Sequence, residues 1–271
     1  MKIGVRGHDY GRHSVAEYAR LLHDEGYDTV QLAVPKAIDG VNGFDDITPA
    51  LLAEIREEFD KQNVEIGIFS CYMDLSNPDD EIREQAVATF CRSLSYAREV
   101  GAKMTGTETS HERLGRMEKS RRFPYMMDSL KRIAQEAERI DAKIGLEPVA
   151  FYPLEDVEAA MEVIKEIGSD KIQIIFDPAN LLQHPEEVRQ EAYWKRCLAL
   201  GGEKIAALHV KDFTMENGER KACALGKGVM ELAPFWEWVR GKEDIVVIRD
   251  ELDLAFASED IAYLQKMKSQ G

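Results

Sequence analysis

Short aliphatic runs alternate along the chain with longer stretches that mix apolar and charged residues. In the longer stretches apolar residues recur every three or four positions, which predicts amphipathic helices. The aliphatic runs are short enough to be buried strands. The predicted strands are Lys2–Arg6, Thr29–Ala33, Glu65–Ser70, Lys103–Thr107, Lys143–Glu147, Gln173–Asp177, Ala206–Val210 and Asp244–Arg249. The clearest predicted helices are Val15–Asp24, Ile82–Val100, Tyr125–Ile140 and Leu154–Ile167.

Strand–helix alternation predicts a parallel sheet with helical crossovers. Eight such units in 271 residues favour an α/β fold of the (β/α)8 TIM-barrel type, formed as one domain over residues 1–271. A doubly wound open sheet is the alternative. Against it, no GxGxxG turn follows the first strand and the sequence contains no Walker-type glycine loop.

The charge balance narrows the class of partner. Acidic residues outnumber basic ones by 50 to 35, for a net charge of −15. An acidic surface repels phosphate backbones, so a general nucleic-acid binder is not expected. The four cysteines form no CxxC pair, and neither a signal peptide nor a membrane-spanning apolar run is visible. We therefore expect a cytoplasmic protein with free thiols and no membrane partner.

Reactive side chains stand at the ends of the last four predicted strands. Glu147 and Asp177 end strands five and six, His209 lies near the end of strand seven, and Glu251 follows strand eight. Barrel enzymes carry their chemistry at this end of the strands. Because side chains alternate along a strand, these groups are expected to point inward. Asp250 adjoins Glu251, and a one-residue shift in register would exchange their faces.

Three carboxylates directed at one point would repel one another unless a cation compensates. Three carboxylates with one imidazole suit one divalent ion, Mn²⁺ or Mg²⁺, while Co²⁺ or Zn²⁺ could also fit. Each residue alone is more often a helix cap, an ion pair or an ordinary hydrogen-bonding group. The recurrence on four consecutive strands is what predicts a metal site.

Other polar residues follow the remaining strands and could line a substrate pocket, although an ordinary structural role is the equal alternative. They are Arg6 and His8 after strand one, Tyr72 after strand three and Glu108 after strand four.

Three features near strand seven also suggest contacts with a substrate. Lys211 could contact a substrate oxygen or pair with Asp212. Arg220, in the polar loop Glu216–Lys221, could bind substrate hydroxyls or a phosphate, with a plain exposed loop as the alternative. The glycines of LGKG at 225–228 permit close approach of the backbone to an anion.

Several short segments resemble the xylose-isomerase-like superfamily of sugar isomerases and epimerases, which includes ketose 3-epimerases. The segments are GTETS at 106–110, GLEPV at 145–149, FDPANLL at 176–182, HVKD at 209–212, LGKG at 225–228 and DEL at 250–252. The resemblance implies that one metal ion is bound by Glu147, Asp177, His209 and Glu251, and that the two glutamates form the catalytic acid/base pair. Many relatives carry a histidine where this chain has Asn180, which can donate a hydrogen bond to substrate but cannot act as a base.

The expected function is a metal-dependent isomerase or epimerase of a sugar or sugar phosphate. Proton transfer beside a carbonyl would pass through an enediolate. Three alternatives remain: a metal-dependent keto-polyol dehydratase on the same site, an endonuclease-IV-like phosphodiesterase, and a sugar-binding barrel without catalysis. Barrels of this type often pair, so a homo-oligomer is also expected.

Overall fold

The computed structural model describes residues 1–183 and 188–270. Eight parallel strands close into a barrel in the order β1-β10-β7-β6-β5-β4-β3-β2. They are β1 (Lys2–Arg6), β2 (Thr29–Leu32), β3 (Glu65–Ser70), β4 (Met104–Thr107), β5 (Ile144–Leu146), β6 (Ile172–Phe176), β7 (Ile205–Val210) and β10 (Val246–Arg249). Because β1 pairs with both β2 and β10, the sheet has no free edge, and the predicted barrel is confirmed.

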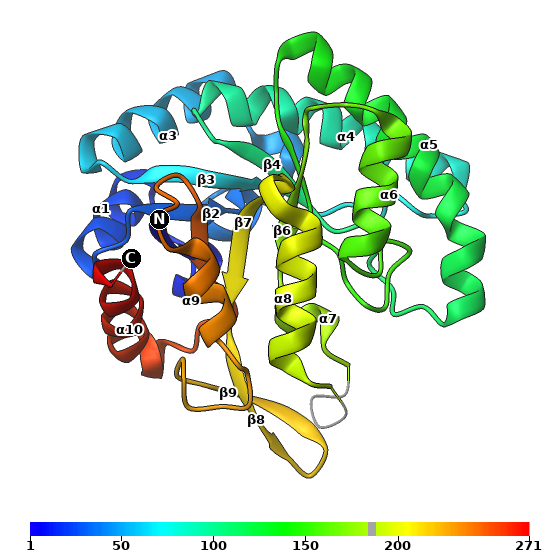
Figure 1. Ribbon diagram of the computed structural model, residues 1–271. Coiled ribbons are helices and arrows are strands. Elements are labelled where there is room, and N and C mark those ends of the chain that lie inside the picture. Colours follow the sequence, from blue (N-terminus) through cyan, green and yellow to red (C-terminus); the bar gives the residue numbers. More distant parts are fainter. Residues whose placement is uncertain (184–187, 271) are drawn as a thin grey trace.

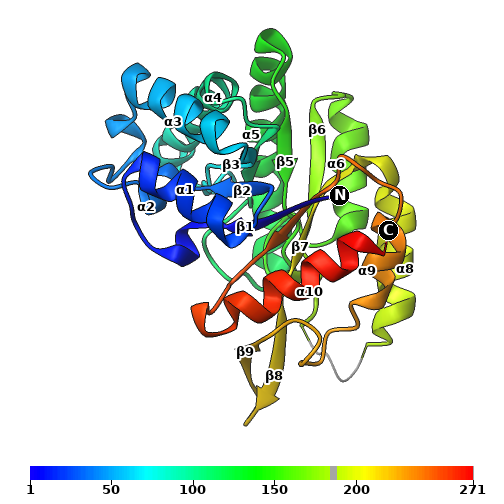
Figure 2. The same cartoon turned by 90° about the vertical axis from the view of Figure 1, so that its left-hand side faces the viewer.

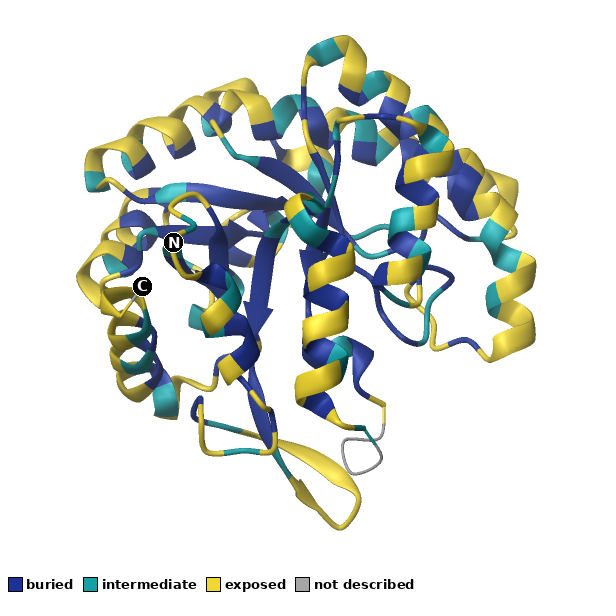
Figure 3. Cartoon of the chain, in the orientation of Figure 1, coloured by how far each residue is buried: buried dark blue, intermediate teal, exposed yellow. Residues whose placement is uncertain are grey.

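Helices surround the strands (Figures 1 and 2). The longer ones are α1 (Val15–Glu25), α3 (Pro49–Gln62), α4 (Asp80–Glu99), α5 (Arg116–Ile140), α6 (Val157–Ile167), α8 (Gln190–Gly201) and α10 (Ala257–Ser269). Shorter ones are α2 (Val34–Ala37), α7 (Pro178–Leu181), α9 (Ala233–Val239) and the 3-10 turns η1 (Gly7–Tyr10), η2 (Phe44–Asp46), η4 (Gly202–Lys204) and η5 (Leu254–Phe256). Buried faces turn toward the strands and exposed faces toward solvent (Figure 3). None of the helices in the described residues has both the length and the apolar character that crossing a membrane requires.

Local sequence signals set the helix ends. Ser14 accepts a hydrogen bond from the backbone N–H of Glu17 at the start of α1, and Gly26 ends that helix in the left-handed region with φ 90°. The start of α5 differs from the prediction, which placed it at Tyr125 rather than Arg116. Its first turns are charged and largely exposed, so they lack the apolar repeat on which the prediction relied.

A small apolar cluster fills the inside of the barrel below the mouth. Its buried members are Ile68, Met104, Ile175, Ala207, Val246 and Ile248. Two residues further along β6, β7 and β10 stand Asp177, His209 and Asp250, which share the inward side of their strands because side chains alternate. Residues two positions after these inward apolar side chains therefore also point inward, at the level of the mouth.

The segment after β7 is a β-hairpin rather than the loop predicted around Arg220. β8 (Asp212–Glu216) and β9 (Glu219–Cys223) pair in antiparallel register and project from the barrel (Figure 1). Asn217 and Gly218 form the turn, with φ 53° and 81°. This Asn-Gly dipeptide is a recognised hairpin signal, and both strands are too polar to have been predicted from hydrophobic alternation.

Candidate metal centre at the barrel mouth

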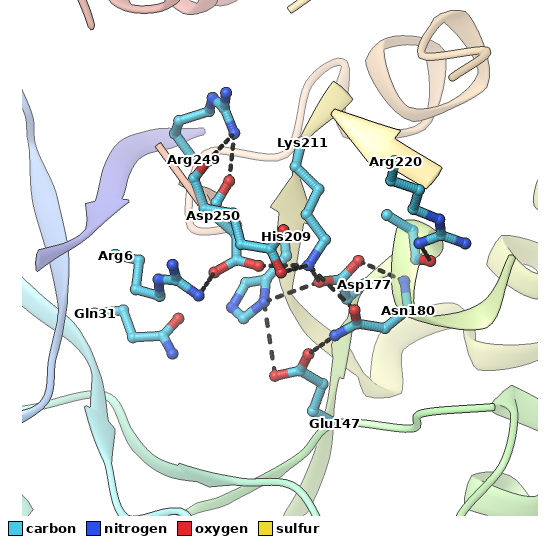
Figure 4. Close-up of polar contacts among 12 residues, drawn as sticks. Arg6, Gln31, Glu147, Asp177, Asn180, His209, Lys211, Arg220, Arg249 and Asp250 are labelled. Carbon is cyan, nitrogen blue, oxygen red and sulfur yellow. Dashed lines mark hydrogen bonds and ion pairs between the residues drawn. The ribbon is translucent and has the colours of Figure 1, made fainter. Parts of the chain in front are cut away.

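Glu147, Asp177 and His209 come together at the mouth as predicted. Each offers one ligand atom, and the three atoms lie within 4.8 Å of one another. His209 Nδ1 is 3.6 Å from Glu147 Oε2 and 3.7 Å from Asp177 Oδ2 (Figure 4). All three side chains are buried. Among the described residues, this is the group of acidic, histidine or cysteine side chains whose geometry suits a metal ion.

The two ring nitrogens of His209 are available to bind a ligand. Neither ring nitrogen has a hydrogen-bond partner among the described residues. Burial disfavours the charged imidazole, but the carboxylate of Glu147 and the contact with Asp177 outweigh burial and raise the pKa of His209 to about 10. Two carboxylates therefore favour a positive charge at this point, and a metal ion bound through a ring nitrogen would supply it.

Glu147 is oriented by two neighbours that follow other strands of the barrel, Asn180 after β6 and Tyr72 after β3. Asn180, in α7, donates a hydrogen bond of 2.7 Å from Nδ2 to Glu147 Oε1. The Tyr72 hydroxyl donates to Glu147 Oε2 at 3.5 Å and in turn accepts a hydrogen bond from Gln31 Nε2. Asn180 thus acts as a hydrogen-bond donor beside the candidate centre, as its amide permits.

Lys211 places a buried positive charge among the carboxylates of the mouth. Its ammonium lies 3.0 Å from Asp177 Oδ2 and 2.7 Å from Asp250 Oδ2. It also lies 2.9 Å from Glu251 Oε1 and 3.1 Å from Asn180 Oδ1. Burial disfavours the ammonium, but the three carboxylates outweigh it and raise the pKa of Lys211. Lys211 therefore pairs with these three carboxylates, and the predicted pairing with Asp212 is wrong.

After β10, the eighth strand of the barrel, Asp250 and Glu251 both line the mouth, and of the two Asp250 is the buried one. Asp250 Oδ2 contacts Lys211, and Oδ1 lies 3.1 Å from Arg6 Nη1. Glu251 has left the strand, with φ 52°, and its side chain is 57% exposed. Because β10 ends at Arg249, Glu251 lies outside the strand, and its exposed side chain still reaches Lys211. Ligation by Glu251 stays a prediction, since Glu251 lies outside the cluster formed by the other three residues.

A cavity of about 490 Å³ opens at the mouth and is lined by Glu147 and His209 of the triad. Five of the six predicted substrate contacts line it: His8, Tyr72, Glu108, Asn180 and Lys211. The sixth, Arg220, is not among the lining residues. Its guanidinium donates to the backbone oxygens of Ala179 and Leu182 and lies over the Phe213 ring, so it ties the hairpin to α7. Whether any of these residues binds substrate stays a prediction.

Sequence reasoning missed some polar groups near the cavity. Ser70 lines the cavity, and both it and Gln31 are buried with an oxygen that has no hydrogen-bond partner among the described residues. Asp9 pairs with Arg6 at 2.7 Å and accepts a hydrogen bond from the backbone N–H of Leu252. A glutamine within the short aliphatic strand β2 was a readable signal, because an unexplained polar residue in a buried strand points to a site.

The glycines of the LGKG segment do approach an anion, but that anion is part of the protein. Asp212 Oδ2 accepts hydrogen bonds from the backbone N–H groups of Gly226, at 3.0 Å, and Gly228, at 2.9 Å. Oδ1 accepts from Phe213 and Met230. The backbone N–H groups of this segment, which were expected to approach a bound anion, are instead used by the Asp212 carboxylate.

Comparison with known proteins agrees with the barrel fold. A family model described as the xylose isomerase-like TIM barrel matches residues 19–265. No curated protein matches the chain.

Solved structures share the fold over nearly their whole length. A D-tagatose 3-epimerase-like protein has a TM-score of 0.79 at 18% identity, covering 100% of this chain and 98% of its own. The magnesium complex of a xylose isomerase-like TIM barrel protein from Mycobacterium smegmatis has a TM-score of 0.75 at 14% identity, covering 99% and 97%. The probable 3-DHS dehydratase AsbF from Bacillus anthracis has a TM-score of 0.76 at 13% identity, covering 98% and 99%. The match of the family model over most of the chain, together with the closed barrel and its triad, shows that the chain belongs to the xylose isomerase-like TIM barrel family.

Proposed function

We propose that this protein is a metal-dependent isomerase or epimerase of a sugar or sugar phosphate, acting by proton transfer beside a carbonyl. The observation that carries the proposal is the buried triad of Glu147, Asp177 and His209, of which Glu147 and His209 line an open cavity. The cavity volume, about 490 Å³, is in the range that small-molecule sites occupy. The epimerase-like fold neighbour supports the same class of reaction.

The triad suits a divalent cation. Two carboxylates and one imidazole offer oxygen and nitrogen ligands, and His209 has both ring nitrogens without hydrogen bonds among the described residues. This donor set favours Mn²⁺ or Mg²⁺ and admits Co²⁺ or Zn²⁺. The magnesium complex of a fold neighbour is consistent with this choice. Glu251 is the proposed fourth ligand and would have to release Lys211 in order to bind.

Glu147 is the proposed proton acceptor. The hydrogen bonds from Asn180 and Tyr72 fix its carboxylate at the cavity floor, where a carbon-bound proton next to a substrate carbonyl can reach it. The bound ion would stabilise the negative charge that develops on the substrate oxygens. Asn180 and Lys211 face the same cavity and can hold substrate hydroxyls in place.

Hydrogen exchange tests the proposal directly. The purified protein is incubated in D₂O with a panel of ketopentoses, ketohexoses and their phosphates, with Mn²⁺ or with a chelator, and followed by NMR. We expect deuterium to enter the position beside the carbonyl of at least one sugar only when Mn²⁺ is present. Absence of exchange with every sugar would overturn the proposal.

The variant Glu147→Gln keeps the size of the side chain but removes the base. We expect it to lower the exchange rate by at least about 100-fold, the usual minimum contribution of a general base. The exposed Glu158→Gln on α6 is the matched control and should exchange at the wild-type rate. Full exchange by Glu147→Gln would remove Glu147 from this role.

The same experiment separates the dehydratase alternative. A dehydratase also removes the proton beside the carbonyl, but then expels a hydroxyl group. Mass spectrometry of the product distinguishes the two reactions, because dehydration lowers the product mass by one water and epimerisation leaves it unchanged.

A further inference from the structure

The charged residues that line the cavity are unevenly distributed around the barrel. The carboxylates among them follow β4, β5 and β10, and they are Glu108, Glu147, Asp250 and Glu251. The wall at the ends of β1, β2 and β3 carries Arg6 and Lys36, and no described residue contributes a carboxylate to this part of the lining. We call this part of the wall the basic side of the cavity.

The basic side lies across the barrel from the triad. In the closed ring β1 stands four strands from β5, which precedes Glu147, and β2 stands four strands from β6, which precedes Asp177. Figure 4 shows Arg6 and Asp177 on opposite sides of His209. A molecule that is held at the triad and crosses the cavity therefore meets the basic side with its far end.

Lys36, in α2, contributes a positive charge that the protein does not compensate. The other two lysine and arginine side chains of the lining, Arg6 and Lys211, are each paired with carboxylates. Lys36 is exposed at the cavity and forms no ion pair or side-chain hydrogen bond within residues 1–183 and 188–270. Its charge is close enough to His8 to lower the pKa of that imidazole. The ammonium of Lys36 is thus available to a molecule in the cavity.

Two polar groups of the basic side lack hydrogen-bond partners among the described residues. They are His8 Nδ1 and Ser70 Oγ, and both residues line the cavity. Ser70 is only 2% exposed. Buried polar groups are normally paired, so an unpaired one indicates a missing partner, such as a ligand atom or an ordered water molecule. The hydroxyl, and the imidazole in one of its tautomers, can each donate a hydrogen bond to an oxygen.

We propose that the substrate of this site carries an anionic group, a phosphate or a carboxylate, at the end away from its carbonyl, and that Lys36 binds this group. The inference rests on the proposed function, in which the triad holds the carbonyl end. It narrows the substrate class from sugars in general to acidic sugars, and it makes Lys36 a specificity-determining residue.

The charge distribution favours one orientation of such a substrate. Carboxylates on the far side of the cavity disfavour an anionic group there, whereas the ammonium of Lys36 attracts it. A hydrogen bond between two charged groups is stronger than one to a neutral hydroxyl. An uncharged sugar therefore gains less from Lys36, and an acidic sugar is placed with its carbonyl at the triad.

The first test compares matched sugars in D₂O with the Mn²⁺-loaded protein. The panel contains ketopentoses and ketohexoses, their terminal phosphates, and ketohexoses whose terminal carbon is a carboxylate. We expect kcat/KM for hydrogen exchange to be at least about 10-fold higher for one anionic form than for its uncharged parent. The phosphate and carboxylate series show which anion is used. Added salt should reduce the preference, because Lys36 is exposed.

The variant Lys36→Met should lower the preference for the anionic form by at least about 10-fold. The loss should appear mainly in KM, because the charge lies away from the reacting carbon. Lys36→Arg restores the charge and should retain most of the preference. Lys165→Met is the matched control, because this exposed lysine lies on α6 and does not line the cavity.

A binding measurement separates this inference from the proposed function. Polyols and polyol phosphates have no carbonyl and cannot react, so calorimetric titration with them reports binding alone. The wild type should bind the phosphate at least about 10-fold more tightly than the polyol, and Lys36→Met should lose this difference.

Equal use of charged and uncharged sugars by the wild type would overturn the inference. A preference that survives in Lys36→Met would do so too, because the anion would then bind the metal ion or another cation. If the wild type exchanges no sugar, the proposed function fails, and the titrations still decide whether Lys36 binds an anion.

Discussion

At the scale of single residues, two basic side chains that line the same cavity differ in charge: His8 is neutral and Lys211 is positive near pH 7. Burial is the largest cause that lowers the pKa of His8, and the nearby positive charges of Arg6 and Lys36 lower it further, to about 4. Lys211 is surrounded by carboxylates, and they raise its pKa despite burial. The cavity wall is therefore neutral at His8 and positive at Lys211 near pH 7.

The depressed pKa of His8 predicts a pH dependence of stability. In the unfolded chain His8 takes up a proton near pH 6.5, whereas in the folded protein it does so only near pH 4. Between these values the unfolded state binds more protons, so the free energy of unfolding falls as the pH falls. We expect His8→Asn to lose less stability than the wild type between pH 7 and pH 5. The difference should be on the order of 1 kcal/mol, after a discount for the partial exposure of the imidazole.

Urea unfolding at both pH values measures this difference. Other groups that titrate in the range contribute equally to both proteins and cancel. An identical loss of stability in His8→Asn and the wild type would show that His8 keeps its ordinary pKa in the folded protein.

At the scale of elements, one buried carboxylate organises the connection between β9 and α9. Asp212, at the start of β8, accepts hydrogen bonds from four backbone N–H groups, three of them in this connection. The connection must approach it closely, and a Cβ atom placed on Gly228 would lie only 2.1 Å from Asp212 Oδ1. Glycine is required here by space rather than by a positive φ.

Gly228→Ala should therefore destabilise the protein by about 2–4 kcal/mol, because the methyl group displaces the carboxylate and leaves buried N–H groups without their acceptor. The matched control is Gly115→Ala, because a Cβ atom there meets nothing within 4 Å. Denaturant unfolding should show a change of less than about 1 kcal/mol for the control. Equal midpoints for the two variants would contradict this account of the loop.

At the scale of the whole molecule, the closed barrel brings carboxylates from several strands to one point of a chain that already carries a net charge of −15. Lys211 compensates part of this charge from within the protein. A divalent ion at the triad would add to the compensation and would stabilise the folded state alone, since the ligands are far apart in the unfolded chain.

Mn²⁺ should accordingly raise the free energy of unfolding, by about 2.7 kcal/mol when its free concentration is 100 times its dissociation constant. Thermal unfolding with Mn²⁺ and with a chelator measures this increase. Asp177→Asn removes a proposed ligand and should abolish most of it, whereas the exposed Asp45→Asn should retain it. If Mn²⁺ stabilises Asp177→Asn as strongly as the wild type, the ion binds elsewhere.

The sequence by itself determined the barrel and the inward placement of the three triad residues. Aliphatic strands and amphipathic helices have different periods, so the order of the elements could be read locally, and strand alternation placed Glu147, Asp177 and His209 on the inward side. The β8–β9 hairpin was also encoded, in Asn217-Gly218, but its polar strands carry no hydrophobic pattern.

Only the tertiary structure decided which partners the other charged residues of the mouth and of the hairpin contact. The choice between Asp250 and Glu251 depends on the residue at which β10 ends, and a one-residue difference exchanges inside for outside. The partners of Lys211 come from β6 and β10, and the anion held by Gly228 comes from β8. The Lys211 contacts join residues far apart in the chain and depend on barrel closure, whereas the Gly228 contact depends on how the connection after β9 folds back onto β8; no periodic pattern records either.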